Sequence, residues 1–297
     1  MLWVGQAGHL TLLRQAGSLS YGECPDGNTS GREYNDLMNT LKRIFVTGSA
    51  GRIGRAAVAE LVACGHHVVG FDAQPTPGLP QERVVVAALA DVDALRRAAT
   101  GADAIVHLAA TPDDARFPRG AAPDDADNFL TDLVPSNIVG PYQILEAARV
   151  LKIPRVILAS TGQVIDGHLR AGSMPVTIDS PPLPRYLYAC TKVFLEALGQ
   201  VYAKEHGIEV LAVRLGWCPR PGQEEEFRQS ELGPDVYLSP GDAGRFFVAA
   251  VEVAKLPPFA VVYATSRHVT KHAYDLSATR ELLGWEPRDR WPEGSDG

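Results

Sequence analysis

Short runs of β-branched residues alternate with longer amphipathic segments from Arg43 to Arg214, and this alternation limits the possible folds more than any other feature. Turn residues or charges bound each run, as is usual for buried strands. We expect strands at residues 43–47, 67–71, 83–87, 103–107, 155–159 and 209–214. Strands separated by helices pair in parallel through right-handed crossovers. The sequence therefore predicts an α/β fold, a doubly wound parallel sheet of the Rossmann type.

The segments between and after these strands complete the expected organisation. Helices are expected at 51–64, 91–99, about 126–151 and about 185–206, where apolar residues recur at helical spacing. After Arg214, prolines punctuate a polar stretch that contains Glu224 to Glu226, which predicts loops that cover a ligand. Residues 241–254 and 277–283 predict two more helices, and 260–264 a short strand. This C-terminal part is expected to be a small substrate lid.

Three regions follow from this pattern. Residues 1–40 show no sustained periodicity and no secretory signal, so we expect an N-terminal extension that is poorly ordered. Met38 precedes the first strand closely and is a candidate start of translation. Residues 41–215 are expected to form the Rossmann-type core, and residues 216–297 a small substrate-binding region.

Composition excludes several classes of protein. Of the 297 residues, 45% are hydrophobic, enough for a large core, and the net charge of −7 disfavours binding to nucleic acid. The chain has no apolar run of the roughly 20 residues that span a bilayer. Its four cysteines show neither metal-ligand nor disulfide-framework spacing (Cys24, Cys64, Cys190 and Cys218). We therefore predict a cytoplasmic protein without a metal, a membrane partner or a nucleic-acid partner.

A glycine-rich turn follows the first predicted strand directly and opens the first helix. In Thr47-Gly48-Ser49-Ala50-Gly51-Arg52-Ile53-Gly54 the glycines have the spacing GxxGxxG. Such glycines allow a tight turn and a close approach of the backbone to a pyrophosphate, and the helix N-terminus favours an anion. A tight turn without a ligand is the alternative for this motif alone.

Asp72 ends the second predicted strand, where a carboxylate can accept hydrogen bonds from an adenosine ribose and repel a 2′-phosphate. Ala73-Gln74-Pro75 follow without a basic residue, so NAD is favoured over NADP. A solvated Asp at the strand end is the alternative.

Tyr188 and Lys192 are four residues apart in a segment predicted to be helical, so they share a helix face. A nearby ammonium stabilises a phenolate, which suits Tyr188 to general acid or base chemistry. A surface lysine on an amphipathic helix is the alternative. Ser160 and Thr161 end the fifth strand, at the edge of the sheet where ligands bind in such folds. Their hydroxyls either face a substrate or cap the next turn.

In this order and spacing, the motifs resemble the extended short-chain dehydrogenase/reductase superfamily, also called the NAD-dependent epimerase/dehydratase family. The resemblance covers about residues 41–287 and also includes His107-Leu108-Ala109-Ala110, Asn137-Ile138-Val139-Gly140 and Arg214-Leu215-Gly216. It implies Tyr188 as the catalytic acid/base, Lys192 as its partner at the nicotinamide ribose, and Thr161 at the catalytic Ser/Thr position. It also implies the cofactor-binding residues, which are Gly48, Ser49, Gly51, Arg52, Ile53, Gly54, Asp72, Leu108, Ala109, Ala110, Tyr188 and Lys192.

The short C-terminal part is most similar to that of uronate dehydrogenases, which oxidise the anomeric carbon of a hexuronate. This similarity implies that four residues contact the substrate: Ser160, Gln163, Trp217 and Arg228. The guanidinium of Arg228 can bind a substrate carboxylate bidentately. A solvated loop Arg among acidic neighbours is the alternative for Arg228. Gly162-Gln163 stands where these enzymes have Asn-His, and it also lacks the Asp-Glu pair of sugar-nucleotide dehydratases. Trp217 replaces a small Ser, and Ala88 replaces a common Asp near the adenine.

The resulting hypothesis is an NAD-dependent oxidoreductase that acts on a hydroxyl of a sugar or sugar acid by Tyr/Lys-assisted hydride transfer. The alternatives are a sugar or nucleotide-sugar epimerase with tightly held NAD, and a non-catalytic NAD-sensing regulator. A regulator would usually lack the Tyr or the Lys, and both are present here. Similar proteins often pair their two long helices, here 126–151 and 185–206, in a homodimer.

Overall fold

Seven parallel strands form a single sheet in the order β3-β2-β1-β4-β5-β6-β7. The computed structural model describes residues 41–112 and 127–293, so the predicted N-terminal extension and Met38 lie outside the described residues. The strands are β1 (Arg43–Thr47), β2 (His67–Asp72), β3 (Val84–Val86), β4 (Ala104–His107), β5 (Arg155–Thr161), β6 (Glu209–Leu215) and β7 (Phe259–Ala264). The predicted α/β fold with a doubly wound parallel sheet is confirmed. The strand order reverses between β1 and β4, and ligands bind beyond the carboxyl ends of strands at such a point.

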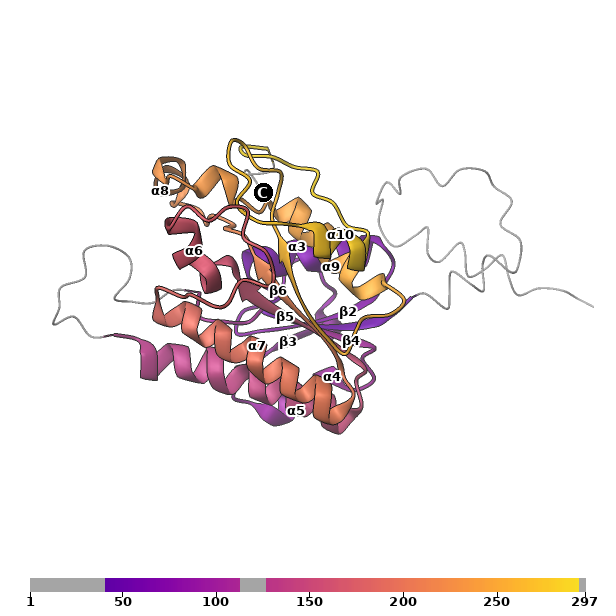
Figure 1. Ribbon diagram of the computed structural model, residues 1–297. Coiled ribbons are helices and arrows are strands. Elements are labelled where there is room, and N and C mark those ends of the chain that lie inside the picture. Colours follow the sequence, from indigo (N-terminus) through magenta and orange to yellow (C-terminus); the bar gives the residue numbers. More distant parts are fainter. Residues whose placement is uncertain (1–40, 113–126, 294–297) are drawn as a thin grey trace, which may run out of the picture. The chain divides into compact units, whose positions relative to one another are not determined.

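Helices cover both faces of the sheet (Figure 1). One face carries α3 (Arg52–Ala63) and α9 (Pro240–Glu252), which pack against each other. The other carries α4 (Val92–Ala99), α5 (Gly140–Leu151) and α7 (Leu187–His206). Because side chains alternate along a strand, Ile44 and Val46 join the first core and Phe45 the second.

The fifth and sixth strands extend beyond their predicted ends. Ser160 and Thr161 belong to β5 because they pair with Arg214 and Leu215 of β6. The third strand is shorter than predicted, because Gln81–Arg83 form a 3-10 turn. The extension of β5 matters for the candidate site, because it fixes the backbone of both hydroxyl residues.

The predicted helix over about 126–151 is two helices. Residue 126 lies outside the described residues; Phe129–Val139 form a π-helix, labelled η2, which continues directly into α5. Pro135 lies inside η2 and has no N–H to donate, and the Gly140 N–H reaches back to the Pro135 carbonyl across the wide turn. Asn137 lies in this segment and is 1% exposed.

The polar stretch after β6 contains a helix that we did not predict. The expectation of loops is wrong at α8 (Glu224–Gln229), because Phe227 on that helix is fully buried. Its ring lies 4.9 Å from that of Trp217, 5.6 Å from Tyr237 and 4.5 Å from Trp291, between centroids. An aromatic cluster therefore anchors a segment that looks polar in sequence.

Two shorter helices complete the architecture. α6 (Asp166–Arg170) follows β5 and was not predicted, whereas α10 (Ser277–Leu283) has its predicted bounds and ends at Gly284, which adopts φ 63°. In Figure 1, α6 and α8 lie at the same end of the sheet, beyond β5 and β6. β7 and α9 add the C-terminal part to the sheet and its helical layer, and the lid role of this part stays a prediction.

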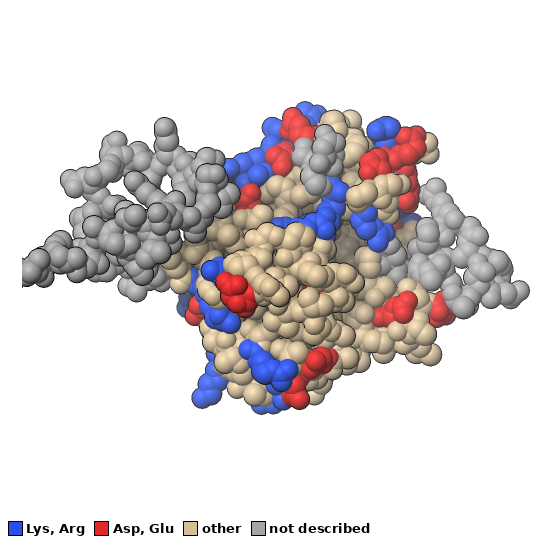
Figure 2. All heavy atoms as spheres, turned by 180° about the vertical axis from the view of Figure 1, so that it is seen from behind, with Lys and Arg blue, Asp and Glu red and all other residues tan. Residues whose placement is uncertain are grey.

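Figure 2 shows acidic and basic side chains interspersed over one face of the molecule. Among the described residues, no helix has the length and apolar character needed to cross a bilayer.

Candidate functional site

The glycine turn lies at the reversal of the strand order, and two of its glycines have no room for a side chain. Gly48 has φ +69°, and a Cβ there would lie 2.5 Å from the Ala109 nitrogen. A Cβ on Gly54 would lie 2.0 Å from the Gly48 carbonyl oxygen. Gly51 precedes the first residue of α3, so the amino end of that helix opens at the turn. The backbone here is suited to a pyrophosphate, because Gly48 and Gly54 carry no side chains that would hinder its approach and the amino end of a helix favours an anion.

The residues after β4 lie against this turn. Leu108 N donates to the Thr47 carbonyl (3.1 Å), and Ala109 meets Gly48 closely. The segment of predicted cofactor residues, Leu108, Ala109 and Ala110, therefore starts next to the glycine turn.

Two backbone amides hold the carboxylate of Asp72. Ala50 N donates to Oδ2 and Gln74 N to Oδ1, each at 3.0 Å. Each oxygen keeps a lone pair, so the group can still accept from ribose hydroxyls. Because Ala50 belongs to the glycine turn, the carboxylate and the turn form one cradle. These residues fit a dinucleotide that has a free 2′-hydroxyl.

Other predicted cofactor residues differ in what they can offer. The Ser49 hydroxyl is buried and hydrogen-bonds the Thr76 hydroxyl at 2.6 Å, so only the backbone of Ser49 can meet a ligand. Arg52 and Ile53 open α3. Burial raises the pKa of the Cys218 thiol, and a hydrogen bond with Arg52 opposes that effect.

Tyr188 and Lys192 lie together on the first turns of α7. Lys192 Nζ is 5.6 Å from the centroid of the Tyr188 ring and donates to the Ala159 carbonyl at 2.8 Å. Lys192 is 3% exposed, and burial lowers its pKa to about 8. The helix and the strand together therefore hold a buried amine beside a half-buried phenol.

Asn137 connects the π-helix to this pair, although the sequence analysis gave it no role of its own. Its amide donates to the Thr111 carbonyl (2.9 Å) and to Thr191 Oγ1 (3.2 Å), and its oxygen accepts from Thr111 N (2.8 Å). Thr191 Oγ1 in turn donates to the Tyr188 carbonyl at 2.7 Å. Asn137 therefore ties the segment after β4 to the turn that carries Tyr188.

The hydroxyls of Ser160 and Thr161 have different surroundings. Ser160 donates to Glu196 Oε1 at 2.5 Å, whereas Thr161 Oγ1 accepts from Gln163 N at 3.3 Å. Thr161 can still donate its proton, because a hydroxyl both donates and accepts. Thr161 thus caps the next turn, as the alternative for this residue expected. The catalytic role of Thr161 and the substrate contact of Ser160 stay predictions.

A buried ion pair that sequence analysis missed lies behind these hydroxyls. Arg214 binds both oxygens of Glu196 (3.0 and 2.9 Å) and donates to Tyr263 Oη (3.1 Å). Glu196 and Arg214 are 7% and 3% exposed. Removing one partner of such a pair leaves an uncompensated buried charge. The only sequence signal is a carboxylate one helical turn after Lys192, on a face predicted to be buried.

The predicted substrate residues beyond β6 do not share one environment. Trp217 is half-buried against Phe227, and Gln163 is exposed. The side chain of Arg228 is 63% exposed and pairs with Glu225 at 2.8 Å. That environment matches the alternative of a solvated Arg among acidic neighbours, and a contact with substrate stays a prediction.

His107 at the end of β4 is a buried titratable group to which the sequence analysis assigned no chemistry. Its Nδ1 lies 2.7 Å from Thr47 Oγ1, and its Nε2 has no hydrogen-bond partner within the described ranges. Burial, with Lys192 nearby, lowers the pKa of His107 to about 3. The imidazole is therefore neutral at physiological pH.

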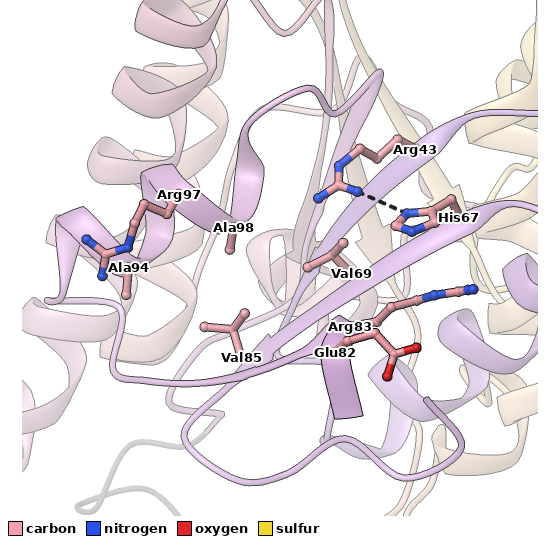
Figure 3. A pocket seen from close by; sticks show the side chains of 9 residues that line it. All are labelled: Arg43, His67, Val69, Glu82, Arg83, Val85, Ala94, Arg97 and Ala98. Atoms are coloured by element: carbon pink, nitrogen blue, oxygen red, sulfur yellow. Dashed lines mark hydrogen bonds between the residues drawn. The ribbon is translucent and has the colours of Figure 1, made fainter. Parts of the chain in front are cut away.

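A pocket of about 520 Å³ lies away from this site (Figure 3). Arg43 and His67, which begin β1 and β2, are hydrogen-bonded at its rim (3.2 Å). The pocket therefore opens at the amino ends of these strands, opposite the glycine turn. Within residues 41–112 and 127–293, no group of three or more His, Cys, Asp or Glu side chains could hold a metal ion.

The buried amine gives a prediction about stability and pH. The unfolded chain keeps the Lys192 proton up to about pH 10.5, whereas the folded protein releases it near pH 8. Relative to a Lys192→Met variant, we therefore expect the wild-type free energy of unfolding to rise by up to about 3 kcal/mol between pH 8 and 10.5. Urea denaturation across this range measures it. Lys204→Met, on the exposed side of the same helix, is the control; equal pH profiles for both variants would contradict the prediction.

Comparisons with known proteins agree with this geometry. A model of the NAD dependent epimerase/dehydratase family matches residues 44–237. The chain is 35% identical over 266 residues to L-arabinose 1-dehydrogenase (NAD(P)(+)) of Haloferax volcanii, which covers 84% of this chain and 97% of the relative. It is 28% identical over 255 residues to a uronate dehydrogenase of Agrobacterium fabrum, covering 84% and 85%.

Solved structures give the same answer. The crystal structure of glucuronic acid dehydrogenase from Chromohalobacter salexigens has a TM-score of 0.67 and 29% identity, covering 85% of this chain and 86% of that one. The uronate dehydrogenase structure from Agrobacterium tumefaciens has a TM-score of 0.66 and 28% identity, covering 84% and 85%. The resemblance seen in the motifs and the predicted cofactor, NAD, are confirmed at the level of the family. This chain belongs to the NAD-dependent epimerase/dehydratase family, the extended short-chain dehydrogenases/reductases.

Proposed function

We propose that the protein is an NAD-dependent dehydrogenase that oxidises a hydroxyl of a sugar or sugar acid. The observation that carries the proposal is the buried Lys192 beside the half-buried Tyr188, at the edge of the sheet where the glycine turn also lies. The sugar and uronate dehydrogenases named above support the substrate class.

Each residue of the pair has a separate task. The Tyr188 phenolate takes the proton of the substrate hydroxyl and becomes the phenol, and the Lys192 ammonium stabilises the phenolate before the transfer. The Ala159 carbonyl keeps the ammonium in place, and the pKa of about 8 lets Lys192 exchange a proton near physiological pH. Thr161, which can still donate, orients the substrate oxygen. When bound, NAD supplies the acceptor for the hydride.

An epimerase is the second candidate, because the matched family includes epimerases and the same pair would serve both reactions. The two differ in whether reduced cofactor leaves the cycle. A dehydrogenase accumulates NADH, whereas an epimerase inverts its substrate and returns NAD.

A panel of aldoses and uronates with NAD tests the proposed function. We expect net NADH, seen at about 340 nm, with at least one of them. The Tyr188→Phe variant is expected to lose turnover by at least about 100-fold, with NAD binding nearly unchanged, because only the proton acceptor is removed. Inversion of a sugar without NADH would favour the epimerase, and full activity in Tyr188→Phe would exclude the proposed role of Tyr188.

Asp72 gives a prediction on cofactor choice. Removing its carboxylate in Asp72→Ala removes both the ribose acceptor and the repulsion of a 2′-phosphate. We expect the ratio of kcat/KM for NAD to that for NADP to fall by roughly tenfold or more. Asp91→Ala, which changes the N-cap of α4, is a control with the same charge change. An unaltered ratio in Asp72→Ala would argue against the ribose assignment.

We also propose a cytoplasmic homodimer that pairs through α5 and α7. Large apolar side chains on these two helices are exposed, and apolar patches of this kind mark interfaces (Tyr142 50%, Val150 46%, Phe194 38% and Val201 53%). The described cysteines, Cys64, Cys190 and Cys218, are free, which suits a reducing compartment. We expect a dimer in sedimentation that Phe194→Asp weakens. A monomeric wild type would contradict the dimer, and recovery from a membrane or secreted fraction would contradict the location.

A further inference from the structure

The hydroxyl of Tyr274 forms no hydrogen bond with any of the residues that the structure describes, although the residue is only 5% exposed. This oxygen is not among the fully enclosed side-chain atoms that lack a partner, so it is accessible to a molecule outside the protein. Hydroxyls of largely buried side chains are normally paired with protein, water or a ligand. A water or a ligand can therefore complete the hydrogen bonds of Tyr274.

The hydroxyl ends at the turn that follows β5. A Cβ on Gly162 would lie 2.2 Å from Tyr274 Oη and 2.8 Å from its Cζ. The phenol therefore occupies the space that any side chain at position 162 would need. Thr161 and Gln163 flank this glycine, so Tyr274 Oη reaches the turn that carries two of the predicted site residues.

The ring is held so that its hydroxyl cannot easily turn away. It stacks on Tyr263, with centroids 4.8 Å apart and planes at 14°. Backbone bonds on both sides fix the chain, from Val176 N to the Ala273 carbonyl (2.9 Å) and from Asp275 N to the Val176 carbonyl (3.0 Å). The Tyr263 hydroxyl, by contrast, has two partners, the Thr177 carbonyl and the Arg214 guanidinium, both at 3.1 Å.

We propose that Tyr274 Oη is a substrate-binding and specificity-determining group that hydrogen-bonds a neutral hydroxyl of the sugar next to the reacting carbon. This proposal rests on the proposed function and makes it more specific, because it names an aldose as the substrate class in place of a uronate. Gly162 belongs to the same proposed site, because only a glycine at this position leaves room for the Tyr274 phenol.

The chemistry of the group supports a neutral partner. Burial raises the pKa of Tyr274 above its usual range, so the phenol stays protonated and both donates and accepts, as a sugar hydroxyl does. A carboxylate would need a cation or several donors. The predicted cation, Arg228, is exposed and already paired with Glu225.

The Tyr274→Phe variant tests the proposal, because it removes the hydroxyl and keeps the ring that stacks on Tyr263. We expect kcat/KM for the best aldose to fall roughly tenfold, mainly through KM, with the Kd for NAD unchanged. We expect the melting temperature of the protein without ligands to stay the same, since the Tyr274 hydroxyl forms no hydrogen bond with the described residues. Tyr263→Phe, which loses two hydrogen bonds, is the control and should lower the melting temperature.

A substrate series completes the experiment. The tenfold effect of Tyr274→Phe should vanish for the deoxy analogue that lacks the contacted hydroxyl, as in a double-mutant cycle. Wild type should also prefer the aldose to the matching uronate. Gly162→Ala, which displaces the phenol, should raise KM for the aldose in the same way as Tyr274→Phe.

Three outcomes would overturn the proposal. An unchanged kcat/KM in Tyr274→Phe, or an equal loss with every deoxy analogue, would exclude a contact with substrate. A fall in melting temperature with no change in KM would make the hydroxyl structural. A wild type that prefers the uronate would reject the aldose. Failure of the proposed function is distinct, because the wild type would then oxidise no sugar at all.

Discussion

Two buried charges one turn apart on α7 attach that helix to the end of β5, and the candidate site depends on this attachment. Lys192 donates to the Ala159 carbonyl, and Glu196 accepts from the Ser160 hydroxyl while Arg214 neutralises it. Buried charges are tolerated only where their partners are in place. The register of α7 against β5 is therefore set by polar contacts as well as by apolar packing, and Tyr188 is positioned as a consequence.

On the cofactor side of the site, the close approach of backbone segments leaves no room for side chains at two glycines. Gly48 packs its backbone on Ala109, and Gly54 packs on the Gly48 carbonyl, so β1, β4 and α3 approach closely. The amide of Ala50 that faces Asp72 belongs to the same turn. One end of the sheet thus carries both the glycine turn and the buried amine, because the turn follows the carboxyl end of β1 and Lys192 binds the Ala159 carbonyl near the carboxyl end of β5.

The turn after β5 joins residues that are distant in the chain. Gly162 and Tyr274 are far apart in sequence, yet the space left by one is filled by the other. The uronate dehydrogenases that the motifs resemble have Asn at 162, whereas this chain has Gly162 and a phenol from the C-terminal segment in the adjoining space. Trp217, another position that differs from those enzymes, packs against Phe227, and Arg228 follows Phe227 on α8.

The sequence by itself determined the sheet and most of its helices, the glycine turn, Asp72 and the Tyr188–Lys192 pair. Each of these depends on residues close together in the chain, where periodicity and spacing act directly. Only the tertiary structure decided the partner of Ser160, the pairing of Glu196 with Arg214, the burial of Phe227 on α8 and the position of the Tyr274 hydroxyl. These contacts join residues distant in sequence, and packing between elements selects them, which no local pattern encodes. The π-helix that carries Asn137 was likewise decided by the tertiary structure. Pro135 indicates that a regular α-helix is interrupted at this point, but it does not predict that the segment forms a π-helix.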